Sequence, residues 1–223
     1  MSGCGLGIEE GETGEDSGGT GEVEAEEQVD SVLSYFPIFP RMVYNFAGEG
    51  IEYAAFNRRI IHVEKSDENN ENNDGNYYVQ FHDETTGTIV ANIYRLGQDQ
   101  VSLIYQEPEF YTEENLIEKI DVTEEKEEDI ILKAPLEEGG VWETETRRRE
   151  IVAIGEEITT EAGDFHDVIK IKVENLEQEN SFITYEYYAK NIGLIKRLNI
   201  GEDDYEIRAE LERFGLEEVE ETE

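Results

Sequence analysis

The chain has 223 residues, of which 56 are acidic and 18 basic, so its formal net charge at pH 7 is −38. A chain this anionic repels polyphosphates and anionic membrane surfaces, which excludes nucleic-acid binding and favours neutral molecules, cations or basic surfaces as partners. Hydrophobic residues make up 37% of the chain, enough to bury a core, and the length fits one large domain or two small ones.

The first 30 residues contain ten acidic residues and eight glycines but no lysine or arginine. Repulsion between like charges and the ordering cost of glycine predict a flexible, extended tether. Residues 217–223 carry five more acidic residues and predict a frayed tail, which leaves 41 acidic against 18 basic residues in between. The folded part is therefore acidic itself, as in proteins of saline habitats and in many extracellular proteins of ordinary habitats.

Cys4 is the single cysteine and follows two small residues, Ser2 and Gly3. This context is typical of the cysteine that is acylated in bacterial lipoproteins, so we expect Cys4 to carry a lipid anchor outside the cytoplasm. No apolar segment precedes Cys4, so this interpretation requires that Met1 replaces a removed signal peptide. The alternative is an exposed thiol near an intracellular N-terminus. No run of the chain approaches the roughly 18 apolar residues of a membrane-spanning helix.

From Tyr35 onwards, short runs of alternating β-branched and aromatic residues predict strands divided by turns rich in Gly, Asn and Asp. Residues 47–50 contain two glycines and predict a hairpin turn. Thr112 fits the cap of a short helix within a long excursion from the sheet at residues 108–129. The predicted strands are 42–46, 51–56 with 59–64, 77–81, 88–96, 100–106, 130–133, a polar strand from Trp142 through 154 with 157–160, 168–174, 182–189, 192–200 and 205–212.

These elements predict a mainly β fold, an antiparallel meander that forms a strongly curved sheet or a barrel-like domain with at most one or two short helices. We expect a tether at residues 1–34, one β-rich domain at 35–215 and an acidic tail at 216–223. A division of the domain into two halves near 108–129 is the alternative.

Several segments between residues 35 and 200 occur in a specific combination: Tyr35-Phe36-Pro37, 48–56 (GEGIEYAAF), 132–136 (LKAPL) with Gly139 and Trp142-Glu143, 160–165, and Tyr187-Tyr188-Ala189 with 193–196 (GLIK). Together they resemble an uncharacterised family of bacterial surface lipoproteins. The resemblance implies a secreted, lipid-anchored, β-rich domain and implies no activity. The sequence departs from the family's usual residues at Val43, Glu161, Val168 and Lys190-Asn191.

Known catalytic and metal-binding patterns are missing from the sequence. The histidines His62, His82 and His166 are scattered, so no zinc site can be written, and we expect no cofactor. The acidic loops 67–74 and 202–204 match no calcium loop and are expected to be solvated, with weak calcium binding as the alternative. The chain has no nucleophile elbow and no phosphate loop, and 56 acidic residues make some carboxylate pair inevitable, so none stands out as a glycosidase site.

Two features remain as candidate binding sites. Arg147-Arg148-Arg149 is the only basic cluster; on a strand its outer members face one side, where they could receive an anionic ligand, and the alternative is pairing with glutamates of neighbouring strands. Aromatic side chains could converge on the concave side of the sheet, as an apolar ligand cavity if the space is empty or as core if it is filled. The proposed cavity residues are Tyr53, Phe56, Tyr105, Trp142, Tyr185 and Tyr187.

The leading hypothesis is a non-enzymatic, lipid-anchored, extracytoplasmic module that binds envelope components. It rests on the context of Cys4, the tether and the missing catalytic motifs. The alternatives are a carrier or chaperone for a hydrophobic ligand held in the concave face, and an envelope hydrolase that uses a carboxylate pair.

Overall fold

The computed structural model describes residues 31–66, 75–122, 124–177 and 182–217. They form one antiparallel sheet of 12 strands, which confirms the predicted fold class. In chain order the elements are the 3-10 helix η1 (Val32–Tyr35), β1 (Met42–Glu49), β2 (Phe56–Lys65), β3 (Tyr77–Thr85), β4 (Thr88–Leu96), β5 (Gln100–Glu107), β6 (Asp129–Lys133), β7 (Val141–Glu143), β8 (Arg147–Thr160), β9 (Gly163–Asn175), β10 (Ile183–Ala189), β11 (Gly193–Ile200), the 3-10 helix η2 (Glu202–Asp204) and β12 (Glu206–Leu216).

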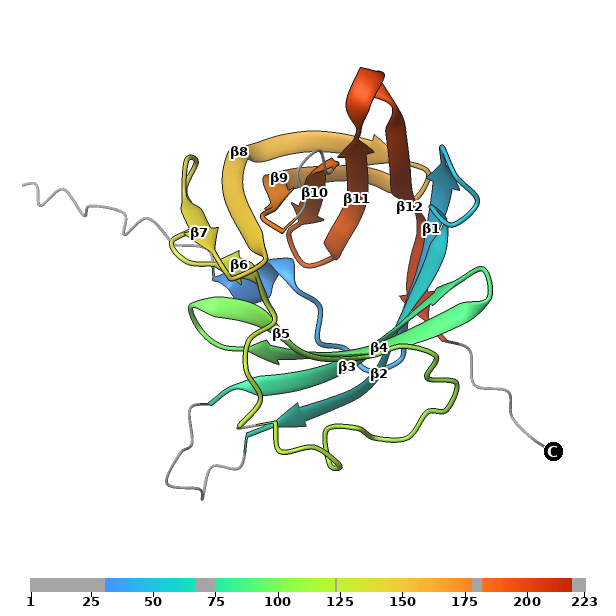
Figure 1. The fold of residues 1–223 in the computed structure, drawn as a ribbon, viewed down its shortest axis with the longest axis vertical. Coiled ribbons are helices and arrows are strands. Elements are labelled where there is room, and N and C mark those ends of the chain that lie inside the picture. Colours follow the sequence, from blue (N-terminus) through green and yellow to red (C-terminus); the bar gives the residue numbers. More distant parts are fainter. Residues whose placement is uncertain (1–30, 67–74, 123, 178–181, 218–223) are drawn as a thin grey trace, which may run out of the picture.

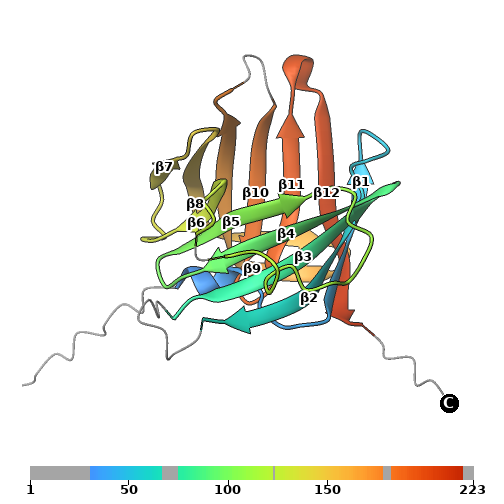
Figure 2. The ribbon, with the colours of Figure 1, turned by 60° about the horizontal axis from the view of Figure 1, so that its bottom comes forward.

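The sheet consists of two six-stranded meanders joined by pairing of the first strand with the last. The order is β6-β5-β4-β3-β2-β1-β12-β11-β10-β9-β8-β7, so only the β1–β12 neighbours are distant in sequence. The strands twist and curl around a central space, which brings the two edge strands β6 and β7 together (Figures 1 and 2). The result is a nearly closed barrel.

Side chains and loop atoms close the seam between β6 and β7. The indole Nε1 of Trp142 on β7 donates a 2.7 Å hydrogen bond to the carbonyl oxygen of Ile130 on β6. The loop that follows β6 also pairs with β8, because Gly139 N donates to the carbonyl of Ile151 at 2.8 Å and Ile151 N donates to the carbonyl of Gly140 at 2.9 Å. These bonds satisfy backbone groups that an open sheet edge would leave exposed.

The N-terminal 3-10 helix η1 belongs to the core of the barrel. Val32 and Tyr35, which lie on either side of the expected boundary at residue 34, are both buried. Phe36 follows them and packs against Phe81 and Tyr94, with ring centroids 5.5 and 5.1 Å away. These aromatic rings belong to the main hydrophobic core of the barrel.

Residues 108–122 leave the sheet, as predicted, and cover the outer face of β3, β4 and β5. Leu116 and Ile117 pack there in a second hydrophobic cluster with residues such as Ile93 and Ile104. The predicted helix from Thr112 is wrong, because the described part of this segment consists of turns. Its backbone is held by side chains of the sheet instead: the Leu116 N–H donates to Oε1 of Gln80 at 2.8 Å.

Three strand predictions need correction. The predicted strand from Trp142 through 154 is divided, because β7 ends at Glu143 and pairs with β8, which begins at Arg147. Residues 51–55 form a turn rather than a strand, and β2 begins at Phe56, whose ring stacks on Phe46 at a centroid distance of 4.3 Å. The predicted break between residues 154 and 157 is absent, because β8 continues through irregular pairing that includes Gly155 with φ at 74°.

Among the described residues, no helix has the length and apolarity needed to cross a membrane.

Candidate functional site

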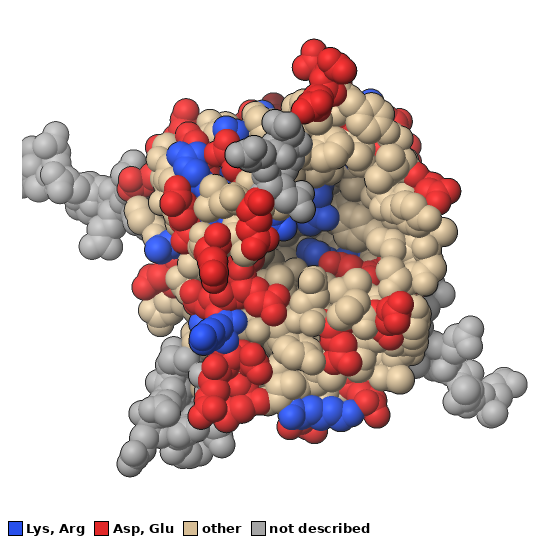
Figure 3. Space-filling view, viewed as in Figure 1, with Lys and Arg blue, Asp and Glu red and all other residues tan. Residues whose placement is uncertain are grey.

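The barrel encloses a cavity of about 590 Å³, visible as a hollow in the surface (Figure 3). Residues two apart on a strand point to the same face, so each strand contributes alternate side chains to the wall. Successive lining residues are Asp129 and Ile131 on β6, Arg147 and Arg149 on β8, Val173 and Asn175 on β9, Thr184, Glu186 and Tyr188 on β10, and Arg197 and Asn199 on β11. A cavity of this volume matches the size of small-molecule sites.

Basic residues gather in this cavity although the chain as a whole is strongly acidic. Four of the chain's ten arginines line it, together with three carboxylates. Figure 3 shows blue side chains within the hollow, whereas most charged side chains on the rest of this face are acidic. The lining residues with a formal charge are Arg58, Arg147, Arg149, Arg197, Asp83, Asp129 and Glu186.

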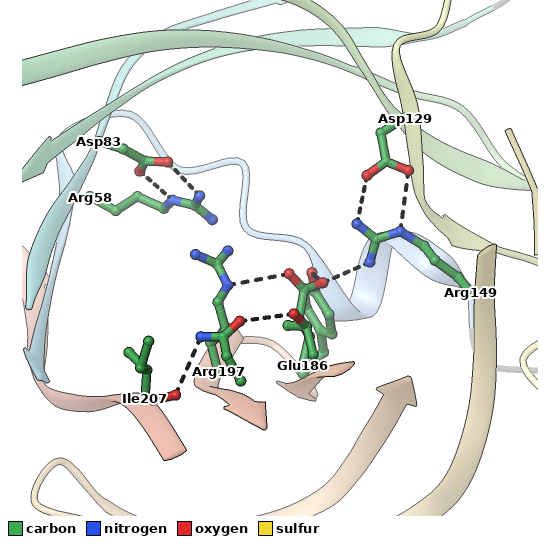
Figure 4. Close-up of polar contacts among 10 residues, drawn as sticks. Arg58, Asp83, Asp129, Arg149, Glu186, Arg197 and Ile207 are labelled. Atoms are coloured by element: carbon green, nitrogen blue, oxygen red, sulfur yellow. Dashed lines mark hydrogen bonds and ion pairs between the residues drawn. The ribbon is translucent and has the colours of Figure 1, made fainter. Parts of the chain in front are cut away.

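Arg149 joins two carboxylates across the seam of the barrel. Its Nε and Nη2 donate to the two oxygens of Asp129 at 3.3 and 2.7 Å, and its Nη1 donates to Oε2 of Glu186 at 2.7 Å (Figure 4). The Arg149 side chain is only 4% exposed. Burial alone would lower the pKa of this guanidinium, but the charge of Glu186 and the hydrogen bond to Asp129 outweigh burial and raise the pKa. Arg149 is therefore a fixed cation with every nitrogen engaged.

Glu186 contacts two arginines and a tyrosine of the cavity wall. Its Oε2 also accepts a 2.8 Å hydrogen bond from the Tyr188 hydroxyl, and its Oε1 lies 3.3 Å from Nε of Arg197. Burial would raise the pKa of Glu186, but Arg149 and Arg197 outweigh it and lower the pKa from 4.5 to about 2. Glu186 therefore remains ionised at neutral pH, and its charge raises the pKa of Tyr188 further above the effect of burial.

Arg58 and Asp83 form a second pair on the opposite wall. Nε and Nη2 of Arg58 donate to the two oxygens of Asp83, each at 2.7 Å, in a bidentate arrangement. The amide of Asn92 donates to the same carboxylate at 3.1 Å, and Gln106 donates to Oδ1 of Asn92 at 2.7 Å. Burial opposes the charge of Arg58, but Asp83 outweighs it, so the pKa of Arg58 is raised. This polar chain fixes the orientation of the Arg58 guanidinium.

Two guanidinium groups present free nitrogens to the cavity. Nη1 of Arg58 and both terminal nitrogens of Arg197 hydrogen-bond to none of the residues that the structure describes. Both groups lie near the Phe56 ring, 5.9 and 5.6 Å from its centroid. Figure 4 shows the two guanidinium groups pointing toward one another. The hydroxyl of Tyr94 lines the same space and is likewise without a hydrogen bond among the described residues.

The basic cluster of the sequence divides between the two faces of β8, as strand geometry predicts. Arg147 and Arg149 line the cavity, and the Arg147 guanidinium contacts no carboxylate within the described ranges. Arg148 faces outward and pairs with Glu174 at 2.7 Å and with Glu150 at 3.2 Å. Pairing with glutamates of neighbouring residues therefore applies to Arg148, and an anionic ligand on the other face of the strand stays a prediction.

A second cavity of about 370 Å³ adjoins the first. The two share Asp83, Phe182, Arg197 and Asn199, so they meet at the free side of the Arg197 guanidinium. We call this second cavity the apolar recess, because most of its remaining walls are apolar. They consist of Ile51, Tyr53, Ala54, Phe56, Thr85, Ile207, Arg208 and Ala209.

The structure brings two of the six proposed aromatic residues to a cavity. Tyr53, which is 56% exposed, and Phe56 line the apolar recess. Tyr185 and Tyr187 lie on the outer face of β10, where Lys170 lies over their rings at 4.9 and 5.4 Å. Because side chains alternate along β10, the residues that face the lumen are Thr184, Glu186 and Tyr188 instead.

The other two aromatic residues have structural contacts. Trp142 is buried at the seam, where its indole donates to the backbone of β6. Tyr105 packs beside the outer cluster under residues 108–122, and its hydroxyl donates to Glu107 at 2.9 Å. The two large cavities include neither residue.

Sequence reasoning missed Arg58, Arg197 and Glu186. A signal exists for Glu186, because a single carboxylate between Tyr185 and Tyr187 is unusual in a strand of buried residues and implies a buried cation. The two arginines carry no comparable signal. Each stands next to another basic residue, Arg58 before Arg59 and Arg197 after Lys196, as is ordinary for surface residues.

The structure offers no metal centre within the ranges it describes. No three residues of His, Cys, Asp or Glu are grouped there in a way that would hold an ion. His62, His82 and His166 are separated: His62 Nε2 contacts the carbonyl of Glu113 and His166 lies near Glu157 at the surface. Cys4 and the acidic loop 67–74 lie outside the described residues.

No protein-family model and no curated protein matches this chain. Two solved structures of bacterial proteins resemble it, each with a TM-score of 0.48 over 81% of this chain and 98% of the other. One is described as a "putative exported protein" with a YmcC-like fold from Bacteroides fragilis, at 13% identity. The other is described as a "putative lipoprotein" from Parabacteroides distasonis, at 16% identity.

Proposed function

We propose that this protein is a non-enzymatic binding module that holds a small polar molecule in the lumen of its barrel. The observation that carries the proposal is the 590 Å³ cavity with buried, oriented charged groups on its wall. Burying charges costs free energy even when they are paired. A barrel that needed only stability would fill this space with apolar side chains, as it does around Phe36 and Phe81.

The lining favours a polar ligand over a purely hydrophobic one. A hydrocarbon placed against Arg58, Arg149 and Glu186 would remove water from charged groups without replacing its hydrogen bonds. A carrier for an uncharged lipid would instead present the apolar and aromatic wall expected from the sequence.

The carboxylates of the cavity are unsuited to acid catalysis. A general acid of a hydrolase needs a raised pKa so that it is protonated at neutral pH. Glu186 has a lowered pKa of about 2, and Asp83 and Asp129 are each held by two nitrogens of an arginine. These contacts support binding rather than hydrolysis.

We further propose that the module is extracytoplasmic and anchored to a membrane by lipid on Cys4. The small residues before Cys4 and the acidic, glycine-rich segment 1–30 support this location.

Thermal unfolding with a library of small polar metabolites tests the lumen as the binding site. Thr184 and Asn175 line the wall on the neighbouring strands β10 and β9, so Thr184→Trp and Asn175→Trp each fill the cavity. Lys172→Trp, on the outer face of β9, is the matched control. We expect at least one compound to raise the Tm of the wild type and of Lys172→Trp but of neither lumen variant. A library without any such compound, or equal stabilisation of all four proteins, contradicts the proposal.

The intact mass of the protein from its native cells tests the location. We expect a mass increase on the N-terminal peptide that contains Cys4, part of which mild base removes as ester-linked acyl chains. An unmodified thiol in the soluble fraction contradicts the lipid anchor and leaves the lumen site unaffected.

A further inference from the structure

We propose that the ligand is an amphiphilic organic anion, whose acid group lies between Arg58 and Arg197 and whose apolar part occupies the apolar recess. This inference rests on the proposed function, because it names the chemical class that the lumen accepts. It identifies the acid group as a carboxylate or a phosphate, which share the planar, multidentate recognition that guanidinium groups provide.

The two guanidinium groups of Arg58 and Arg197 are placed to hold an acid group between them. Arg58 and Arg197 come from β2 and β11, yet both lie within 6 Å of the Phe56 ring centroid and point toward one another across the lumen (Figure 4). Each is bound by a carboxylate only along one edge: Arg58 by Asp83 through Nε and Nη2, and Arg197 by Glu186 through Nε. The nitrogens left over, Nη1 of Arg58 and both terminal nitrogens of Arg197, are directed into the shared space.

Two cations that face one another in a partly dehydrated cavity repel, and an anion between them removes that repulsion. The carboxylates of the cavity cannot move into this position. Asp83 is held by Arg58 and by Asn92, and Glu186 is held by Arg149 and by Tyr188. The Tyr94 hydroxyl lines the same space and adds a further donor for an acid oxygen.

The apolar recess determines which kind of group is attached to the acid. It begins at Arg197 and Phe182, which belong to both cavities, and continues along Ile207 and Ala209 of β12 to Tyr53. Its volume of about 370 Å³ is large enough for a medium-length alkyl chain or an aromatic ring. A ligand with only an acid group would leave this surface wetted, so the apolar part contributes affinity by burying it.

The anionic exterior is consistent with this selectivity. With a net charge of −38, the surface repels anions at long range, and inorganic anions gain too few contacts to overcome that repulsion. An amphiphilic anion gains apolar burial in addition to its contacts with arginine. The overall charge of the chain predicts cationic or neutral partners, whereas the arginines of the lumen favour an anionic ligand.

Isothermal titration calorimetry at constant ionic strength tests the inference with four probes: octanoate, octyl phosphate, 1-octanol and inorganic phosphate. We expect one or both octyl anions to bind at least about tenfold more tightly than 1-octanol and than inorganic phosphate. Arg197→Gln should weaken binding of the octyl anion by about 10- to 100-fold, the range for one charge-assisted hydrogen-bonded contact. Arg213→Gln is the matched control, because Arg213 donates to Asn45 outside both cavities and should leave affinity unchanged.

Two further variants keep the test decisive. Arg197→Lys retains the positive charge beside Glu186, so it remains available if Arg197→Gln does not fold, and we expect it to bind the octyl anion more weakly than the wild type. Tyr53→Ser shortens the wall of the apolar recess and should weaken octanoate without changing the affinity for inorganic phosphate.

The anion assignment is overturned if 1-octanol binds as tightly as octanoate, if Arg197→Gln leaves the affinity unchanged, or if neither octyl anion binds. The lumen as a binding site survives each of these results when a library compound still stabilises the wild type and not the lumen variants. Both proposals fail only when the library and all four probes give no lumen-dependent binding.

Discussion

Replacing Glu186 by glutamine should destabilise the barrel by an amount that depends on pH. The pKa of Glu186 is lowered from 4.5 to about 2 by Arg149 and Arg197 against the cost of burial, and the side chain is only 9% exposed. A shift of about 2.5 pKa units corresponds to about 3 kcal/mol of stability in the ionised state. Glutamine keeps the size of the side chain but loses this contribution, so we expect the free energy of unfolding at pH 7 to fall by about 3 kcal/mol.

The sign of the pH dependence follows from the lowered pKa. The contribution of Glu186 is complete above pH 4.5, where the carboxylate is ionised in both the folded and unfolded states. It is lost as the pH falls toward 2, because the unfolded state takes up a proton before the folded state does. At pH 3 about 2 kcal/mol of it has disappeared, so the difference in stability between wild type and Glu186→Gln should narrow to about 1 kcal/mol.

Urea unfolding monitored by tryptophan fluorescence at pH 7 and pH 3 measures both differences. Other carboxylates titrate over the same range, but their effect cancels when the variant is compared with the wild type at each pH. Glu210→Gln is the control, because Glu210 pairs with Lys196 at the partly exposed outer face and should cost at most about 1 kcal/mol at either pH. A difference for Glu186→Gln that stays constant between pH 7 and pH 3 would refute the coupling of this carboxylate to the arginines.

Three further outcomes are expected. Arg149→Leu should destabilise the protein by about 3 to 5 kcal/mol in urea unfolding, since two buried carboxylates lose their cation, whereas Arg148→Leu on the outer face should have a much smaller effect. Trp142→Phe removes the seam hydrogen bond to Ile130 and should cost about 1 to 3 kcal/mol, with faster amide exchange in β6 than in β10; equal exchange in both would argue against a role in closing the seam. Burial and the nearby Arg59 lower the pKa of His82 to about 4, so the stability that neutral His82 provides is complete above pH 6.5 and declines as the pH falls to 4. The urea midpoint of His82→Gln should therefore fall less over this pH range than that of the wild type, and identical pH profiles would contradict the lowered pKa.

The fold was largely predictable because hydrophobic alternation reports which face of a strand is buried. Residues 168–174 alternate Ile and Val with Lys and Glu, and β9 follows that pattern, with Ile169 and Ile171 inside and Lys170 and Lys172 outside. The turn at 51–55 was misassigned because its apolar residues line a recess rather than a strand face. Alternation describes burial, and a loop that folds over a cavity carries the same signal as a strand.

The sequence predicts residues of the candidate site only where the alternation of side chains along one strand shows that they share a face. Arg147 and Arg149 share a face because they are two residues apart, and the sequence showed this directly. The prediction that Tyr185 and Tyr187 line a cavity is wrong, because alternation separates the two faces of β10 but does not identify which one faces the lumen. The position of both Arg58 and Arg197 beside the Phe56 ring depends on the curvature of the sheet, because β1 and β12 lie between β2 and β11, and no local sequence pattern encodes that curvature.

A crystal structure of the complex with 8-bromooctanoate tests the central claim most directly, because anomalous scattering locates the bromine while the density shows the carboxylate. The account predicts the carboxylate between the guanidinium groups of Arg58 and Arg197 and the bromine in the apolar recess near Tyr53. Bromine sites confined to the outer surface, with no carboxylate in the lumen at saturating probe, would contradict it.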